Sequence, residues 1–251
     1  MRKSVCPLLL VIVLCVAFCK NAFSQAAQVD SSSQQFALNN AVTLFHASLG
    51  DGSPLYNGPE YYFYDPLIKG NAYFLDVNAF TTGSVFYDGA SYTGVPMLYD
   101  LYSDNVAVLL YNHFTKFTLI KEKVKSFDFL EHHFVNINAD TISVNTSGIK
   151  SGFYDQVYNE KSAVLVKRSK SIQTSTGSLS GVEKYFSPAT DYYLWKNNTF
   201  YSVNSQGALL NALKDRKKEL EQYIKKGQIK FRKGPEEAMV KIVSYYDHLT
   251  N

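Results

Sequence analysis

The sequence predicts a mainly β protein of the α+β class, in which an antiparallel curved sheet, sandwich or barrel carries a short N-terminal helix and a C-terminal helical pair. Short runs of β-branched and aromatic residues, separated by turn residues, fill the chain between about residues 55 and 203. Apolar residues at helical spacing occur before and after this region. The chain has 251 residues, 46% hydrophobic and 19% charged, which is typical of a globular protein.

The first 24 residues have the three parts of a secretory signal peptide. Arg2 and Lys3 precede a mostly apolar stretch over residues 4–18, and small residues at positions 22 and 24 precede Gln25. The apolar run is shorter than the ~20 residues that span a bilayer. We therefore predict cleavage before Gln25, no transmembrane span afterwards, and export to the periplasm or the outer envelope.

Cleavage changes the composition of the chain. The three cysteines, Cys6, Cys15 and Cys19, all lie in the predicted signal, so the mature chain would have neither disulfides nor a cysteine ligand or nucleophile. Bulky residues precede Cys15 and Cys19, which argues against a lipid anchor. Three of the 25 basic residues leave as well, so 22 basic residues would balance 22 acidic ones. This balance disfavours nucleic acid as a partner.

The predicted mature chain begins with a leader and a helix. Residues 25–35 are rich in Ser, Gln and Ala, which predicts a flexible leader. Apolar residues over 36–49 recur mostly at helical intervals and predict a short amphipathic helix, which the turn-forming residues 50–54 end. This helix and the β-rich region form a predicted domain over 36–204.

The β-rich region consists of short strand-like runs. The regular turn residues between them favour hairpins over crossover helices, and Asp88-Gly89 and Asn197-Asn198 are the clearest tight-turn pairs. The predicted strands are Glu60–Tyr64, Ala72–Leu75, Ser84–Tyr87, Val95–Leu101, Val106–Tyr111, Phe117–Lys121, Phe127–Leu130, Phe134–Ile137, Thr141–Val144, Phe153–Tyr158, Ala163–Lys167, Tyr192–Trp195 and Phe200–Val203.

Residues 205–251 predict a helical pair that packs on the β domain. Ser205 is a suitable N-cap for a first helix, and Gly227 is placed to end it in the left-handed conformation. Pro235 occupies the favoured first turn of a second helix over 236–249. The predicted buried face of this second helix consists of Ala238, Met239, Ile242, Val243, Tyr246 and Leu249.

Three segments carry a resemblance to other proteins: Leu55–Tyr61, the hairpin Gly83–Gly89 and the tail Phe231–Ala238. Together they resemble a group of exported envelope proteins of Bacteroidota-type bacteria that has no assigned activity. The resemblance implies a periplasmic or outer-envelope address and carries no mechanism.

Motifs for catalysis or for metal binding are weak. Glu131-His132-His133 is the densest ionisable cluster, but adjacent histidines on a strand point to opposite faces, so we expect a polar hairpin turn and no metal site. The sequence contains no nucleophile elbow, phosphate loop or dinucleotide fingerprint, and we expect no cofactor. The acidic residues Asp65, Asp76, Asp88, Asp100 and Asp104 leave a carboxylate pair open.

Aromatic residues are the remaining functional signal. They make up 15% of the chain, with a dense patch at residues 61–64, and most of them are expected to fill the sheet core. Aromatic faces also stack on sugars and line apolar pockets. The candidate ligand-binding residues are therefore Tyr61, Tyr62, Tyr64 and Trp195.

The leading hypothesis is a non-enzymatic binding or scaffold module that uses an aromatic β surface. Its partner would be an envelope protein, a glycan or an apolar small molecule. The first alternative is a periplasmic carrier of an apolar ligand such as a lipid, which requires an apolar cavity. The second is a hydrolase that depends on two facing carboxylates.

Overall fold

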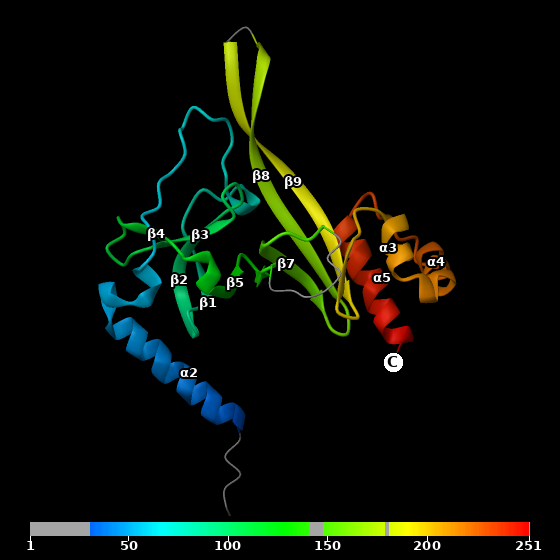
Figure 1. The fold of residues 1–251 in the computed structure, drawn as a ribbon, viewed down its shortest axis with the longest axis horizontal. Coiled ribbons are helices and arrows are strands. Elements are labelled where there is room, and N and C mark those ends of the chain that lie inside the picture. The colour runs from blue at the N-terminus through cyan, green and yellow to red at the C-terminus, as the bar shows by residue number, and fades with distance from the viewer. Residues whose placement is uncertain (1–30, 141–147, 179–180, 251) are drawn as a thin grey trace, which may run out of the picture. The chain divides into compact units, whose positions relative to one another are not determined.

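The computed structural model describes residues 31–140, 148–178 and 181–250 (Figure 1). The predicted signal peptide, its cysteines and the predicted strand at 141–144 lie outside the described residues. The chain divides into two units, residues 1–40 and residues 41–251. The whole sheet and the C-terminal helices belong to the second unit.

The N-terminal helix α2 (Ser31–Ser48) crosses the boundary between the units. Residues 31–35 already belong to this helix and not to the predicted leader. The helix is therefore confirmed. Four of its apolar side chains, Phe36, Leu38, Leu44 and Phe45, are exposed, at 69%, 57%, 71% and 59%.

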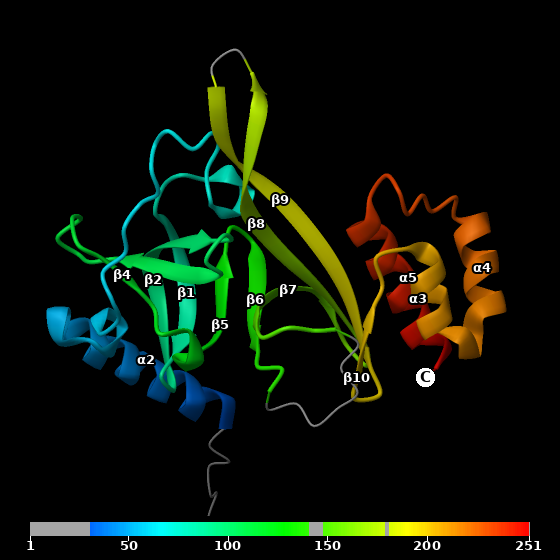
Figure 2. The same cartoon turned by 45° about the horizontal axis from the view of Figure 1, so that its top comes forward.

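Ten strands of the described residues form one open antiparallel sheet, which confirms the mainly β prediction and selects the open sheet over a sandwich or barrel (Figure 2). The strand order is β10-β9-β8-β7-β6-β5-β1-β2-β3-β4. The strands are β1 (Thr81–Tyr87), β2 (Ala90–Asp100), β3 (Asn105–Leu109), β4 (Lys116–Thr118), β5 (Val124–Phe129), β6 (His132–Ile137), β7 (Gly152–Asn159), β8 (Ala163–Ser178), β9 (Gly181–Lys196) and β10 (Thr199–Ser202).

Both predicted tight turns are present. Asp88 and Gly89 have φ values of 50° and 81°, and Asn197 and Asn198 have 50° and 56°. Positive φ at both central positions matches the right-handed twist of the flanking strands. A third turn of this kind lies at Leu130-Glu131, with φ values of 51° and 64°.

Two predicted strands are wrong. Residues 60–64 and 72–75 lie in the segment 57–80, which joins no ladder and pairs with the sheet at isolated bridges, from Glu60 to Phe117, from Lys69 to Tyr185 and from Tyr73 to Asp100. Their alternating aromatic residues pack onto the sheet from outside its ladder. Tyr61 and Tyr73, for example, join a buried cluster with Leu98 of β2.

The hairpin of β8 and β9 is much longer than predicted. Its ladder runs from Ala163↔Trp195 out to Ser178↔Gly181, whereas neighbouring β7 pairs with β8 only up to Val166. We call residues 167–191 beyond this point the arm (Figure 1). Most of the arm residues whose burial the structure describes are half-buried or exposed, so the sequence of the arm lacks the apolar alternation that predicts a strand.

The sheet carries two main cores. The first is rich in aromatic residues: Phe74, Tyr99, Phe127, Phe134 and Phe153 lie in one buried cluster. The second joins Val164 of β8 and Leu194 of β9 to the C-terminal helices. The sheet is thus filled by side chains around its central strands and covered by helices at its β8–β9 end.

The C-terminal region contains three helices where two were predicted. They are α3 (Gln206–Ala212), α4 (Lys217–Lys226) and α5 (Pro235–Leu249). The predicted first helix breaks after Leu213, whose ψ is 33°, because Asp215 in the break bonds Lys196 of β9 at 2.7 Å and Tyr246 of α5 at 2.7 Å.

The helix ends agree with the prediction at two positions of three. The Ser205 hydroxyl accepts a hydrogen bond from the Ala208 N–H at 3.2 Å, and Pro235 begins α5. The prediction that Gly227 is the left-handed residue is wrong, because its φ is −80°. Gln228, the next residue, has a positive φ of 50°. The predicted face of α5 is buried except for the half-buried Leu249.

Candidate ligand-binding cleft

A cleft of about 530 Å³ lies between the segment 57–80 and β9. We call it the aromatic cleft. Phe186 is its residue from β9, and every other residue that lines it comes from the segment 57–80. The lining residues are Phe63, Tyr64, Asp65, Pro66, Ile68, Gly70, Asn71, Ala72, Tyr73, Asn78 and Phe186.

Asp100, at the end of β2, anchors the start of this segment. Its carboxylate is fully buried and accepts hydrogen bonds from the hydroxyls of Tyr61, at 3.1 Å, and Tyr64, at 2.6 Å. Its other oxygen accepts from the backbone N–H groups of Tyr102, at 2.9 Å, and Ser103, at 3.1 Å. One buried carboxylate therefore fixes two tyrosines and the turn after β2 together.

The two tyrosines act as permanent donors. Burial raises the pKa of the Tyr64 hydroxyl above its ordinary value, and its hydrogen bond to Asp100 raises it further. Burial, followed by the charge of Asp100, raises the pKa of Tyr61 in the same direction. Both phenols therefore stay protonated at neutral pH and can donate to Asp100 there.

Aromatic rings form the wall of the cleft. The Tyr64 ring meets Phe186 edge-on at 5.5 Å and Tyr102 at 5.3 Å, and Tyr102 meets Phe186 at 5.9 Å. Phe63 meets Tyr73 edge-on at 6.4 Å and is 52% exposed. Edge-to-face packing is the favoured arrangement of such rings and holds them rigidly, so the exposed ring of Phe63 lies on an ordered surface.

The arm holds the other end of the segment 57–80. Lys170 of β8, whose side chain is only 7% exposed, donates to the carbonyls of Asn71 and Tyr73 at 2.9 Å each and pairs with Asp76. The backbone of Lys69 pairs with the edge of β9, where its N–H donates to the Lys184 carbonyl at 2.9 Å. The cleft is thus pre-formed, because both of its walls are tied by backbone and buried side-chain contacts.

Polar groups lie among the rings. Asp65 uses one carboxylate oxygen to accept the Leu67 N–H at 2.9 Å, and Asn71 accepts the Tyr73 N–H at 2.9 Å. Among the residues that the structure describes, no group hydrogen-bonds the Asn78 side chain. The cleft therefore combines apolar faces with an amide and a carboxylate, the usual composition of a small-molecule site.

The structure separates the four predicted ligand-binding residues. Tyr64 lines the cleft, and Tyr61 supports it from below through Asp100. Tyr62 is 71% exposed and its hydroxyl instead donates to Glu60 at 2.6 Å. Trp195 of β9 packs in a different cluster, with Tyr154 and Phe200.

Sequence reasoning missed Phe186, Phe63 as a cleft residue, and Asn78. Phe186 lies in the polar arm, where no strand was predicted. The available signal was the aromatic pair Tyr185-Phe186 in an otherwise polar stretch. Asn78 carried no signal, because its position depends on how the segment 57–80 folds back over the sheet.

The acidic residues do not assemble into a free carboxylate pair. Asp76 pairs with Lys170, Asp88 with Lys123 at 2.8 Å, and Asp104 with Lys121 and Lys167. Asp100 accepts four donors and Asp65 accepts a backbone N–H. Each of the five predicted acids has its own set of donors, as a structural carboxylate does.

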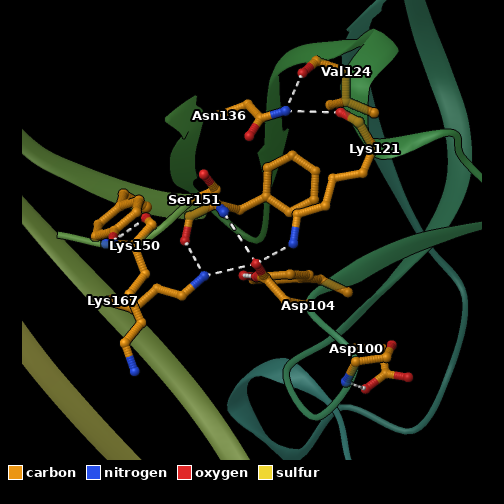
Figure 3. A network of polar contacts seen from close by, with 12 residues as sticks. Asp100, Asp104, Lys121, Val124, Asn136, Lys150, Ser151 and Lys167 are labelled. Carbon is orange, nitrogen blue, oxygen red and sulfur yellow. Dashed lines mark hydrogen bonds and ion pairs between the residues drawn. The ribbon is translucent and has the colours of Figure 1, made fainter. Parts of the chain in front are cut away.

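The cluster around Asp104 is the most concentrated of these (Figure 3). Lys121 and Lys167 converge on one carboxylate oxygen at 2.5 and 2.7 Å, and Tyr99 donates to the other at 2.8 Å. Burial lowers the pKa of Lys167. The charge of Asp104 opposes this shift, and the charge of Lys121 adds to it. Gly152 is required beside them, because its φ is 147° and a Cβ would collide with Asp104 and Lys167.

The two adjacent histidines point to opposite faces of β6, as predicted. His132 contacts Asp155 at 2.7 Å and His133 contacts Asp128 at 2.6 Å, each through Nδ1. The turn itself lies at Leu130-Glu131, one residue earlier than the predicted cluster. In the described part of the chain, no group of three or more His, Cys, Asp or Glu side chains is placed to hold a metal ion.

A second, larger cleft of about 710 Å³ lies between the start of α3 and the connector before α5. Its lining contains Lys230, Arg232 and Lys233, and Phe231 is its single aromatic residue. Because Phe231 is buried in the helical core at 8% exposure, this cleft offers no exposed ring. The aromatic cleft is the stronger candidate site.

No protein-family model, curated protein or solved structure matches the chain. The function is therefore argued from the cleft itself. Among the described helices, none combines the length and apolar character that a membrane crossing requires.

Proposed function

We propose that the protein is an exported, non-enzymatic binding module that takes a neutral glycan in the aromatic cleft. The observation that carries the proposal is the exposed ring of Phe63 beside the polar groups of Asp65 and Asn78, in a cleft of about 530 Å³. Sugar rings present C–H faces that stack on aromatic side chains, and hydroxyls that bond amides and carboxylates.

The two alternatives have less support. A lipid carrier needs an apolar cavity, yet the centre of the sheet is filled by rings such as Phe127 and Phe134, which stack at 4.7 Å. A hydrolase needs two carboxylates that face each other across a cleft, and the five candidate acids are each engaged by separate donors. A binding function requires neither feature.

The exported address belongs to the same proposal. It rests on the basic start, the apolar run and the small residues before Gln25, and on the resemblance to envelope proteins. Sequencing of the natural N-terminus tests it. Gln25 as the first residue is the expected result, and an intact Met1 in a cytosolic fraction would contradict the address.

Glycan binding is tested by screening the mature chain on an array of neutral oligosaccharides, followed by calorimetric titration of the best ligand. Phe63→Ala removes the exposed ring and is expected to weaken binding about tenfold or more. Asn78→Ala is expected to weaken it less, because one hydrogen bond is lost. Neither change removes a hydrogen bond of Asp100, although Phe63→Ala also removes ring contacts to Tyr61 and Tyr73.

Phe114→Ala is the matched control for this test. Phe114 is 82% exposed at the turn between β3 and β4 and does not line the cleft. The Phe114→Ala variant should bind the oligosaccharide as tightly as the unmodified chain. Equal losses in the Phe63 and Phe114 variants, or no binding to any neutral oligosaccharide, would refute the proposed ligand.

A further inference from the structure

The arm has one covered edge and one open edge. Lys170 and Pro188 lie opposite each other in its ladder, and Pro188 has no N–H, so this pair does not bond across the hairpin. The alternation of an antiparallel ladder then points the backbone groups of Ile172 and Thr174 outward on β8, and those of Phe186 and Lys184 outward on β9.

Other contacts in the structure confirm this alternation. On the β9 side, Phe186 donates to the Lys69 carbonyl at 3.0 Å and Lys184 accepts from the Lys69 N–H at 2.9 Å. On the β8 side, the outward N–H of Lys170 donates to the Leu101 carbonyl at 3.1 Å. Beyond Lys170, within the described residues, no segment of the chain covers the outward groups of Ile172 and Thr174.

From Ser171 to Ser175 the open edge lacks the residues that usually protect an edge strand, and the register of its ladder shifts only beyond this stretch, between Ser175 and Ser178. Natural edges carry Lys, Pro or inward charges that block pairing with another chain. The covered β9 edge has Glu183, Lys184 and Pro188, whereas residues 171–176 of β8 read Ser-Ile-Gln-Thr-Ser-Thr and contain no charge and no proline. Thr and Ile are, in addition, strong strand formers.

We propose that the β8 edge at residues 172–174 pairs antiparallel with the same edge of a second copy of this chain. In a two-fold arrangement Gln173 faces its own copy and Ile172 faces Thr174, so the same surface serves both partners. An uncharged edge meets its copy without like-charge repulsion, which is why a second copy fits it. Pairing turns a two-stranded ribbon, which is marginal alone, into a four-stranded sheet.

Sedimentation velocity of the full mature chain over a range of concentrations tests this pairing. The chain is expected to form a dimer as its concentration rises. Thr174→Pro deletes an outward N–H without touching the internal ladder, as the native Pro188 does on the other strand. We expect it to weaken the dimer about tenfold or more.

Lys184→Pro is the matched control, because Lys184 is the cross-strand partner of Thr174 and lies on the other edge of the same hairpin. The Lys184→Pro variant should dimerise with the same affinity as the unmodified chain. A chain that stays monomeric at every concentration, or two proline variants with equal dimer affinity, would overturn the proposal.

Hydrogen exchange in the unmodified chain gives a second measurement that does not depend on how the variants fold. The amides of Ile172 and Thr174 should exchange more slowly as the protein concentration rises. The outward amide of Lys184 should not change. Exchange at Ile172 and Thr174 that is independent of concentration would equally overturn the pairing.

Discussion

Single carboxylates organise much of this protein's polar interior. Asp100 joins the segment 57–80 to the turn after β2, and Asp104 joins Lys121, in the turn before β5, to Lys167 of β8. Asn136 supports the second arrangement by donating to the carbonyls of Lys121 and Val124 at 2.7 and 2.8 Å. Asp100 ends β2 and Asp104 lies in the turn that follows, and each carboxylate brings distant parts of the chain together.

Asp104→Asn is expected to destabilise the fold by about 3 kcal/mol, because two partly buried ammonium groups would lose their shared counter-charge. The side chains of Asp104 and Lys167 are 17% and 16% exposed, so water replaces little of the lost interaction. Urea unfolding of the variant and the unmodified chain measures the difference.

Asp88→Asn is the control for this prediction. Asp88 also pairs with one lysine, but the two side chains are 43% and 41% exposed, so water screens the pair and it contributes little to stability. Asn also tolerates the φ of 50° at this position. A loss for Asp104→Asn no larger than that for Asp88→Asn would show that the cluster does not stabilise the fold.

At the scale of elements, helix ends depend on local chemistry that can be followed in the sequence. Ser205 caps α3 and Pro235 begins α5, as the residue types predict. The break between α3 and α4 has a tertiary cause, since Asp215 reaches Lys196 and Tyr246 from other elements. No local pattern could have shown it.

Ser205→Ala is expected to lower the free energy of unfolding by about 1 kcal/mol, because the cap of the Ala208 N–H is lost. Ser205→Gly should cost only a few tenths of a kcal/mol, since glycine lets water reach the same N–H. Thermal unfolding of both variants compares them. Equal losses would mean that the hydroxyl does not act as a cap.

The strands show where sequence patterns predict structure and where they do not. Hairpins such as β1–β2 have alternating burial and a turn pair of defined geometry, and both signals are local. The segment 57–80 has strand-like aromatic alternation, yet its tyrosines bond Asp100 instead of entering the ladder. The arm has the opposite property, because its strands pair continuously from Lys167 to Ser175 although most of their side chains are half-buried or exposed.

At the scale of the whole sheet, Arg168 connects the two cores. Its guanidinium binds Asp155 of β7 at 2.7 Å and Glu236 of α5 at 2.7 Å, and lies 5.6 Å from the ring centre of Phe74. Asp155 is almost fully buried and also contacts His132. The aromatic core and the helical core thus share one charged group.

Arg168→Met is expected to destabilise the protein by about 3 kcal/mol, since Asp155 would remain buried with a single partner. Glu236→Gln, which changes only the more exposed end of the bridge, should cost less than about 1 kcal/mol. Denaturant unfolding followed separately by tyrosine fluorescence and by helical circular dichroism measures both. Equal costs for the two variants would contradict this role of Arg168.

The candidate site was predictable in part. The predicted aromatic patch at residues 61–64 contains two residues that line the aromatic cleft, Phe63 and Tyr64, and aromatic density is visible in the sequence. The split between Tyr61 and Tyr64, which face Asp100, and Tyr62, which faces Glu60, depends on the path of an irregular segment. Phe186 reaches the cleft only because the arm extends past its neighbours, which is a property of the assembled sheet.

The strand order has a consequence for how the chain folds as it is made. Eight of the nine neighbouring strand pairs are consecutive in the chain, and the exception is β1 with β5, where Ser84 lies opposite Asp128. The first four strands can therefore assemble early, but β1 must wait for its inner partner until β5 has emerged. Until then the edge of β1 stays unpaired and open to wrong pairing. Pairing of β1 with β5 is the step with the largest loop-closure cost between neighbouring strands.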